Sequence, residues 1–312
     1  MATVHPFPAV RPKPELAPQI CELPYDVMST AEARQMAEGN PHSFLRVSRA
    51  ELEFPDGTDP YSPQVYERAA ANFRKLLDQG ALIQDSKPCY YLYRQQMGSH
   101  IQTGIVAAFS CDEYRRGIIK KHEFTRPDKE DDRVRHIEAL NSQTGPVFLT
   151  YPAQKALTDL QGQIAAGAPT LTLTAPDGII HTAWVIDQDD KIEFIRSQFE
   201  SIPSLYIADG HHRSAAANRV DLARHGAGQS GKFLAVVFPH DQLQILAYNR
   251  VVKDLNGLSI LDTAKRLSEL GKVAVSEQKN SRPQTSGVFL SSEQMAHIGL
   301  VAYVAGEREK PD

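Results

Sequence analysis

The sequence predicts an α+β fold in which a mixed sheet is flanked by helices. Strand-like and helical patterns interleave along the 312 residues without the strict alternation that a doubly wound parallel sheet requires. Two apolar runs, 89–97 and 102–110, flank a short turn at 98–100, which is the pattern of an antiparallel hairpin. The P-loop signature Gly-x-x-x-x-Gly-Lys-Ser/Thr is absent, and we expect neither a P-loop nor a Rossmann fold.

The first half of the chain carries one proline-rich segment and several regular elements. Six prolines in residues 1–24 exclude a long helix, so this segment either wraps over a later core or is mobile. A helix capped by Ser29 or Thr30 follows, and another helix over 66–77 has its apolar residues on one face. The run 43–48 alternates apolar and polar residues, which predicts a half-buried strand.

After the hairpin, helices and strands are again mixed. The segment 153–180 has weak signals and predicts either a helix plus a strand or a connection between domains. The remaining patterns predict helices over 128–142, 191–200 and 211–224, and strands over 146–152, 181–187, 204–208, 232–239 and 243–252.

The length predicts two domains, since a typical domain has roughly 150 residues. We place an N-terminal α+β region at 1–152 and a C-terminal α+β region at 153–312. The sequence after Gly287 begins like a pair of strands and ends in a charged run. We therefore expect the chain to be truncated at its C-terminus.

Composition limits the classes of partner. The chain has 34 lysines and arginines against 38 acidic residues, a net charge of −4, which argues against a broad nucleic-acid surface. No run approaches the roughly 20 apolar residues of a membrane span, and the N-terminus lacks the basic region of a signal peptide. The three cysteines are too widely spaced for a disulfide framework or a cysteine metal site. We expect a cytoplasmic protein of unknown oligomeric state.

The most informative stretch is Ser-Leu-Tyr-Ile-Ala-Asp-Gly-His-His-Arg at 204–213, where an apolar strand leads through an Asp-Gly turn into a helix. A helix N-terminus offers free N–H groups and partial positive charge, so it favours anions. His211, His212 and Arg213 add cationic groups that the helix dipole disfavours, which indicates a bound anion such as phosphate. Asp209 is either a helix cap or a carboxylate that holds Mg²⁺ or accepts a proton.

Two other interpretations of this stretch remain open. It is either a simple capped helix with surface histidines or a zinc site formed by Asp209, His211 and His212. Adjacent helical residues diverge by about 100°, which makes joint ligation of one metal unusual. In each case Gly210 supplies the backbone freedom that the sharp turn needs.

Residues 112–136 form a second charged segment, with eight basic and seven acidic side chains in twenty-five positions. One interpretation is a solvated helix with ion pairs. The other is ligand binding, because a strand end delivers Lys120, Lys121, His122 and Glu123 into one loop. Basic loops beside an acidic group suit the binding of di- or triphosphates with a metal. Further candidate phosphate-binding side chains of the segment are Arg126, Arg133 and His136, of which the last two share a helical face.

Several segments together resemble a widespread bacterial and archaeal family that is catalogued as domain of unknown function 1015. The resemblance covers most of residues 4–255, and family members continue past position 312. It rests on the stretches PFPAVRP (6–12), LPYDV (23–27), NPHSFLRV (40–47), YRQQM (93–97), QTGIVA (102–107), IKKHEFTRPDKEDDR (119–133), GPVFLTY (145–151) and YIADGHHRSAAA (206–217).

The stretch from Asp209 to Arg213 is also similar to the nucleotide-phosphate motif of the ParB-like and sulfiredoxin-like superfamily, which includes free-serine kinases. This second resemblance covers about a dozen residues. It implies a ParB/sulfiredoxin-like element around 204–252 and phosphoryl transfer from a nucleotide to a small hydroxyl compound, with serine the named candidate. A separate glutamate is the base in those kinases, and we match it to Glu123. The Pro-Tyr-Asp turn at 24–26 is a rival source of an acid, or a rigid turn.

We therefore expect an enzyme that binds ATP or ADP with Mg²⁺ and phosphorylates a small metabolite. In this hypothesis Asp209 holds Mg²⁺, Glu123 or a histidine is the base, and Arg213, Lys120 and Lys121 neutralise phosphate charge. The alternatives are a phosphatase or nucleotide hydrolase, with water as the acceptor, and a non-catalytic nucleotide-binding sensor module.

Overall fold

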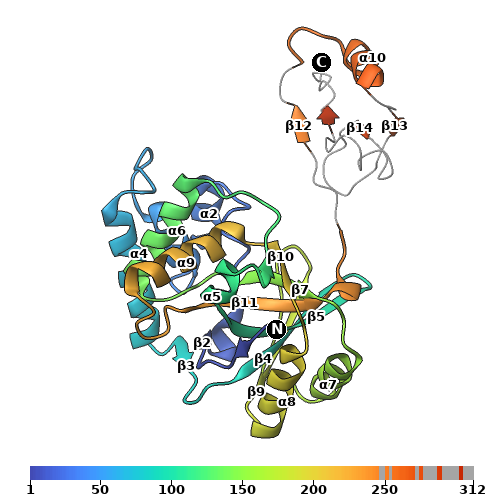
Figure 1. Cartoon of the computed structure of the whole chain (residues 1–312). Helices are drawn as coiled ribbons and strands as arrows, with labels where there is room; N and C mark the ends of the chain where they lie inside the picture. The colour runs from blue at the N-terminus through green and yellow to red at the C-terminus, as the bar shows by residue number, and fades with distance from the viewer. Residues whose placement is uncertain (246–249, 253–254, 271–273, 277–286, 290–301, 305–312) are drawn as a thin grey trace. The chain divides into compact units, whose positions relative to one another are not determined.

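The computed structural model of the chain describes residues 1–245, 250–252, 255–270, 274–276, 287–289 and 302–304. The chain divides into two compact units, Met1–Leu243 and Gln244–Asp312 (Figure 1). The first unit contains a large mixed sheet flanked by helices, which confirms the predicted α+β fold class. The expected ParB/sulfiredoxin-like element at 204–252 stays a prediction, and part of it lies outside the described residues.

Among the described residues, nine strands form the sheet of the first unit. Eight lie in the order β6-β10-β7-β11-β5-β4-β9-β8, and β1 pairs with the last residues of β5. Their bounds are β1 Val4–His5, β4 Tyr90–Met97, β5 His100–Ser110, β6 Ile119–Lys120, β7 Val147–Tyr151, β8 Leu171–Thr174, β9 Ile180–Ile186, β10 Leu205–Asp209 and β11 Lys232–Pro239. Since β7 pairs with β10 and β11, the sheet takes strands from both sides of residue 152.

The sheet is mixed, and one of its parallel pairs determines which loops meet. β6 and β10 run parallel, with Ile119 opposite Leu205, and β7 and β11 run parallel, with Leu149 opposite Val237. The other pairs of this sheet are antiparallel, including the predicted hairpin of β4 and β5. Parallel strands end at the same edge of a sheet. The loop after β6 and the turn after β10 are therefore neighbours.

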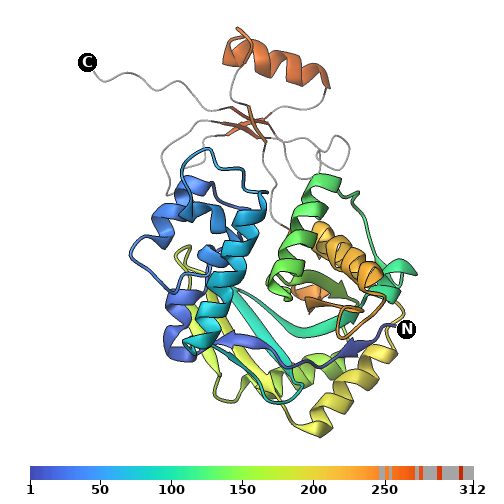
Figure 2. The same ribbon diagram turned by 90° about the vertical axis from the view of Figure 1, so that its left-hand side faces the viewer.

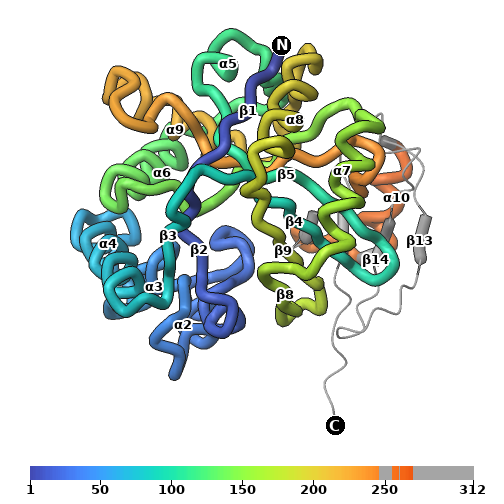
Figure 3. Tube along the Cα trace, turned by 90° about the horizontal axis from the view of Figure 1, so that it is seen from below, coloured from blue at the N-terminus to red at the C-terminus, as the bar shows by residue number. Residues whose placement is uncertain are grey.

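Helices cover both faces of the sheet (Figures 1 and 2). α6 (Pro127–Leu140) and α9 (His211–Arg224) lie on one face, with α4 (Pro63–Asp78) packed beside α6. α7 (Lys155–Ala165) and α8 (Asp189–Glu200) cover the other face, which Figure 3 shows from below. In the part of the chain that the structure describes, no helix has both the length and the apolar character needed to cross a membrane.

The main core lies between the sheet and these helices. Tyr90, Phe109 and Leu149 on the strands and Phe199 on α8 are fully buried in it. In β11 the residues from Phe233 to Phe238 are buried on both faces except for Leu234. A strand covered by helices on both sides needs apolar residues at successive positions, which explains why its sequence is a continuous apolar run.

The proline-rich start of the chain is extended and paired with later strands. β2 (Val10–Pro12) pairs antiparallel with β3 (Leu82–Gln84), and short helices follow at Pro14–Leu16 and at Ala17–Ile20 (α1). α2 (Thr30–Ala37) begins at a capping box formed by Ser29 and Glu32. Other short helices are Ala50–Glu53, Cys111–Arg115 (α5) and His240–Gln242.

The predicted strand over 43–48 is wrong, because Leu45–Ser48 form a single helical turn, α3. Leu45 packs in a small apolar cluster with α2, whereas Val47 packs in another apolar cluster with α4. The two residues face different cores although they are only two positions apart. A short helix between two cores therefore shows the same apolar alternation as a half-buried strand.

The second unit is described in part. It contains α10 (Ile260–Leu270), a parallel pair of β12 (Arg250–Val252) and β15 (Ala302–Val304), and an antiparallel pair of β13 (Ala274–Ser276) and β14 (Gly287–Phe289). The predicted strand over 243–252 lies partly outside the described residues, and so does most of the sequence after Gly287.

Candidate functional site

The turn between β10 and α9 leaves the start of α9 without a side-chain cap. Gly210 is the N-cap residue, with a φ of 93° that only glycine adopts without strain, and no side chain accepts a hydrogen bond from the first turn. Asp209 is therefore not the helix cap. Its carboxylate instead pairs with the guanidinium of Arg213, one turn later. The first N–H groups of α9 remain available to an anion.

The loop that follows β6 lies against this helix start, as the parallel pairing requires. The Nδ1 atom of His211 lies 3.3 Å from the Glu123 carboxylate, and the backbone N–H of His122 points to its Nε2 at 3.4 Å. The backbone N–H of Arg126 donates to the Nε2 of His212 at 3.1 Å. The two histidines of α9 thus hold the loop 121–126, and the structure joins the two candidate segments in one site.

These contacts define the protonation state of His211. Its Nε2 accepts a hydrogen bond, so in the neutral ring the proton is on Nδ1, the atom that lies 3.3 Å from the Glu123 carboxylate. The ring is 3 % exposed, and burial, followed by the neighbouring His122, lowers its pKa, although Glu123 and Asp209 oppose this effect. His211 is therefore a neutral ring beside the Glu123 carboxylate, whose side chain is 56 % exposed.

The Arg213 side chain lies close to the backbone of Gly210 and Gly145, and other groups of the protein bind its guanidinium. A Cβ at Gly210 would lie 3.1 Å from the Arg213 guanidinium carbon, and one at Gly145 would lie 3.2 Å from its Cδ. The guanidinium contacts the Asp209 carboxylate and the Pro146 carbonyl. Because guanidinium has five N–H donors, these two contacts leave others for a ligand.

The two lysines of the predicted site differ in their surroundings. Lys120 is the exposed last residue of β6. Lys121 places its ammonium 4.2 Å from the ring centroid of Tyr114, a cation–π contact. Tyr114 carries no sequence signal for this role, so sequence reasoning missed it. Phe124, in the middle of the loop, is fully exposed.

The start and outer face of α6 carry ion pairs. The Arg126 guanidinium lies 2.7 Å from the Asp128 carboxylate, and Arg219 of α9 bridges Glu130 and Asp131 at 3.3 and 2.7 Å. For this face the interpretation as a solvated helix with ion pairs describes the contacts well. The pairs also fix α6 against α9 at the base of the loop.

Arg133 and His136 lie on the other side of α6. The Nε2 of His136 donates to the Val47 carbonyl at 3.1 Å, and the ring is 5 % exposed. Arg133 pairs with Asp132 at 2.5 Å, and its guanidinium carbon lies 4.3 Å from the ring centroid of Tyr25. The contacts of these two residues are thus with α3 and the Pro-Tyr-Asp turn, and not with the loop 121–126.

The Pro-Tyr-Asp turn itself is close to the candidate site. Burial raises the pKa of Tyr25 above its usual value, while the charges of Arg133 and Arg213 oppose the rise. The positive charges of Arg133 and Arg213 therefore both favour the ionised form of the Tyr25 phenol. The rigid-turn interpretation agrees with the contacts of Arg49, which donates to the carbonyls of Tyr25 and Met28 at 2.8 and 2.7 Å.

A glycine-rich run follows α9, but it does not lie between a strand and a helix as a phosphate-binding loop does. Residues 226–231, Gly-Ala-Gly-Gln-Ser-Gly, match the spacing Gly-x-Gly-x-x-Gly. Dinucleotide-binding loops of this type follow a strand and begin a helix. Here the run follows α9 and leads into β11, so it does not begin a helix. The Rossmann interpretation therefore stays excluded.

Within the described part of the chain, no group of three histidine, cysteine or acidic residues could hold a metal ion. This finding gives no support to the zinc site of Asp209, His211 and His212. A magnesium ion that arrives with a nucleotide needs only one or two protein carboxylates besides phosphate and water. Asp209 and Glu123 have exposed side chains and fit that smaller requirement.

Comparison with known proteins identifies a family but no function. No curated protein and no solved structure matches the chain. The model of one family, described as protein of unknown function (DUF1015), matches residues 4–305. The match covers both segments of the candidate site, and it shows that the chain belongs to the DUF1015 family.

Proposed function

We propose that the protein binds the phosphate groups of a nucleotide at the N-terminus of α9 and transfers a phosphoryl group to a small hydroxyl metabolite. The observation that carries the proposal is the contact between His211 and Glu123 at 3.3 Å. It places an exposed carboxylate beside the uncapped helix start. Phosphoryl transfer needs these two parts together, an anion site and a group that receives the proton of the acceptor.

Several groups support the binding of phosphate at this position. The first N–H groups of α9 and the helix dipole favour an anion. Lys120 and Lys121 bring positive charge from the neighbouring strand end and loop, whereas the guanidinium of Arg126 is paired with Asp128. Arg213 stabilises the turn through Asp209 and Pro146 and contributes its charge there.

In the proposed reaction the acceptor hydroxyl attacks the terminal phosphorus of the nucleotide. Its oxygen forms the new P–O bond, the bond to the leaving phosphate breaks, and Glu123 takes the hydroxyl proton. His211, with Nδ1 3.3 Å from the Glu123 carboxylate, is the neighbour that would keep Glu123 in place. Asp209 would hold Mg²⁺, which supplies charge neutralisation on the phosphates.

The test is the substitution Glu123→Gln. The amide has the shape of the carboxylate and leaves the backbone bonds of the loop to His211 and His212 intact, but it cannot take a proton. We expect nucleotide affinity within about twofold of wild type and turnover lowered by about 10²–10⁴-fold. Binding is measured by calorimetry with ATP, ADP and Mg²⁺, and turnover by product formation with serine and other small hydroxyl compounds. Glu193→Gln, an exposed change on α8, is the matched control.

The same experiment separates the alternatives. Release of inorganic phosphate that is independent of any metabolite would indicate a hydrolase. Nucleotide binding without turnover would indicate a sensor module. If neither nucleotides nor inorganic phosphate bind the full chain at millimolar concentration, the phosphate site at the start of α9 is wrong.

A further inference from the structure

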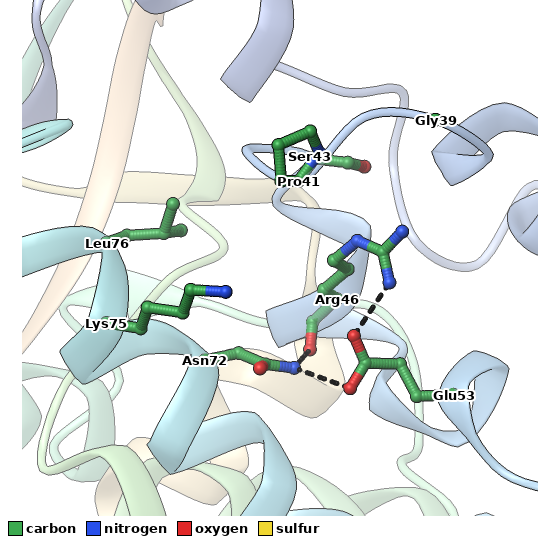
Figure 4. Close-up of a pocket in the computed structure, with 8 residues that line it drawn as sticks. All are labelled: Gly39, Pro41, Ser43, Arg46, Glu53, Asn72, Lys75 and Leu76. Atoms are coloured by element: carbon green, nitrogen blue, oxygen red, sulfur yellow. Dashed lines mark hydrogen bonds and ion pairs between the residues drawn. The ribbon is translucent and has the colours of Figure 1, made fainter. Parts of the chain in front are cut away.

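A polar cavity is lined by the loop after α2, by α3, by the short helix Ala50–Glu53 and by α4, and none of its lining residues belongs to the candidate site. It has a volume of about 350 Å³, which is within the range of small-molecule sites. Figure 4 shows the cavity and the side chains around it. The lining residues are Gly39, Pro41, Ser43, Arg46, Glu53, Asn72, Lys75 and Leu76.

The charged side chains that line the cavity are Arg46, Glu53 and Lys75, and all but one of them are paired. Arg46 lies 2.7 Å from the Glu53 carboxylate and also donates to the carbonyls of Ala37 and Asn40 at 2.9 and 3.1 Å. The other oxygen of Glu53 accepts from Arg68 at 3.0 Å. Hydrogen bonds from Arg46, Asn72 and Arg68 lower the pKa of Glu53 although its burial acts in the opposite direction, so this carboxylate is ionised.

The charge that remains is Lys75, an exposed residue of α4. It extends from α4 toward Arg46 (Figure 4), and none of the described residues offers its ammonium a hydrogen-bond or ion-pair partner. Glu53 cannot neutralise it, since two arginines already contact that carboxylate. The lining therefore carries excess positive charge.

Ser43 provides a second group without a partner. The residue is 5 % exposed and lines the cavity, and its hydroxyl makes no hydrogen bond to any described residue. Its Oγ atom is not among the fully buried side-chain atoms that lack a partner, so the hydroxyl can be reached from the cavity. Ser43 and Lys75 therefore offer a hydroxyl donor and an ammonium to the same open cavity.

We propose that this cavity binds a small aliphatic carboxylate through the Lys75 ammonium and the Ser43 hydroxyl. Pro41 and Leu76 line the cavity as well and suit the carbon chain of an organic acid. Inorganic phosphate offers no apolar part to them and would fill only a small fraction of the volume. The proposal is independent of the phosphate site at the start of α9.

The experiment measures the binding of lactate, succinate and malate to the full chain by calorimetry, at constant ionic strength, with succinamide as the neutral probe and inorganic phosphate as the inorganic one. We expect at least one carboxylate to bind and succinamide not to bind. Lys75→Met keeps the aliphatic stem and removes the charge, so it should weaken binding by about ten- to a hundredfold. Arg74→Met, an exposed change next to it on α4, should leave binding unchanged.

Ser43→Ala gives an independent readout because the predicted effects on the free and the bound protein differ. Removal of a hydroxyl that has no protein partner should change the melting temperature of the ligand-free protein little. It should reduce the increase in melting temperature that the carboxylate causes. The proposal is overturned if no carboxylate binds, if phosphate alone binds, or if Lys75→Met and Arg74→Met behave alike.

Discussion

The imidazole of His136 is 5 % exposed, and its Nε2 donates to the Val47 carbonyl at 3.1 Å. Burial is the main cause that lowers the pKa of this ring from 6.5 to about 4, and the charge of Arg133 adds to it. The folded protein therefore holds His136 neutral at pH values where the unfolded chain binds a proton. Its hydrogen bond to the Val47 carbonyl joins α6 to α3.

A pH dependence of stability follows from this pKa. The unfolded state gains a proton at this residue as the pH falls through about 6.5, and the folded state gains one only near 4. Over this interval the free energy of unfolding should fall by roughly 3 kcal/mol because of His136. Urea unfolding at pH 7.5, 6 and 5 measures the decline.

The variant His136→Asn isolates this contribution. Its amide can still donate to the Val47 carbonyl but does not titrate, so its stability should depend less steeply on pH between 6.5 and 4. The control is His240→Asn, a change at an exposed histidine. Equal slopes for wild type and His136→Asn would contradict the assignment.

Arg133 and His136 also show what the sequence could not indicate at the scale of single residues. Their spacing correctly predicted a shared helical face, but periodicity does not say which neighbour that face meets. The face meets Tyr25 and Val47, which are distant in sequence. The positions of Glu123 after a strand end and of His211 at a helix start were predictable, because these boundaries have local signals, whereas the roles of the two residues stay a prediction.

At the scale of elements, the junction between β10 and α9 depends on Gly210. A side chain here meets an unfavourable φ of 93° and would lie 3.1 Å from the Arg213 guanidinium carbon. We expect Gly210→Ala to lower the free energy of unfolding by about 1–3 kcal/mol and to weaken phosphate binding, because Arg213 must move. Thermal unfolding and calorimetry with ADP measure the two effects.

Gly162 in α7 offers the opposite case as a control. It has ordinary helical φ, and no atom lies within 4 Å of the position that a Cβ would take. Gly162→Ala should therefore raise the free energy of unfolding by about 0.5–1 kcal/mol. If both substitutions have the same sign, backbone conformation is not what requires glycine at Gly210.

Elements with strong periodicity or caps were predicted well from the sequence. The helix over 128–142 and the strand over 204–208 correspond to α6 and β10 within a few residues. The prediction failed at α3, where two cores lie on either side of a single helical turn. Local patterns report which residues are buried but not how many cores bury them.

At the scale of the whole molecule, the first unit contains the large sheet and every residue of the candidate site. We expect residues 1–243 alone to fold and to bind phosphate ligands as the full chain does, because the last strand of the sheet ends at Pro239. Circular dichroism and thermal unfolding of this fragment provide the measurement.

A shorter fragment, 1–231, is the matched negative control. It lacks β11, which lies between β7 and β5, so its sheet would be divided and its apolar edges exposed. This fragment should fail to fold. A folded 1–231 fragment, or an unfolded 1–243 fragment, would contradict the division of the chain into these units.

The order of strands was the part of the fold that the sequence could not supply. The antiparallel hairpin of β4 and β5 was predictable because its turn is local. The position of β10 between β6 and β7 depends on pairings between distant segments, for which a single sequence carries no signal. The meeting of the loop 121–126 with α9 follows from this placement.

The same placement of β10 has a consequence for synthesis on the ribosome. Among the described strands β7 pairs only with β10 and β11, so both of its edges stay open until residues 205–209 and 232–239 have been made. At a rate of synthesis of about 5–20 residues per second, β7 therefore stays unpaired for several seconds. During this interval it is a target for chaperones and for aggregation, and the phosphate site can form only after the wait has ended.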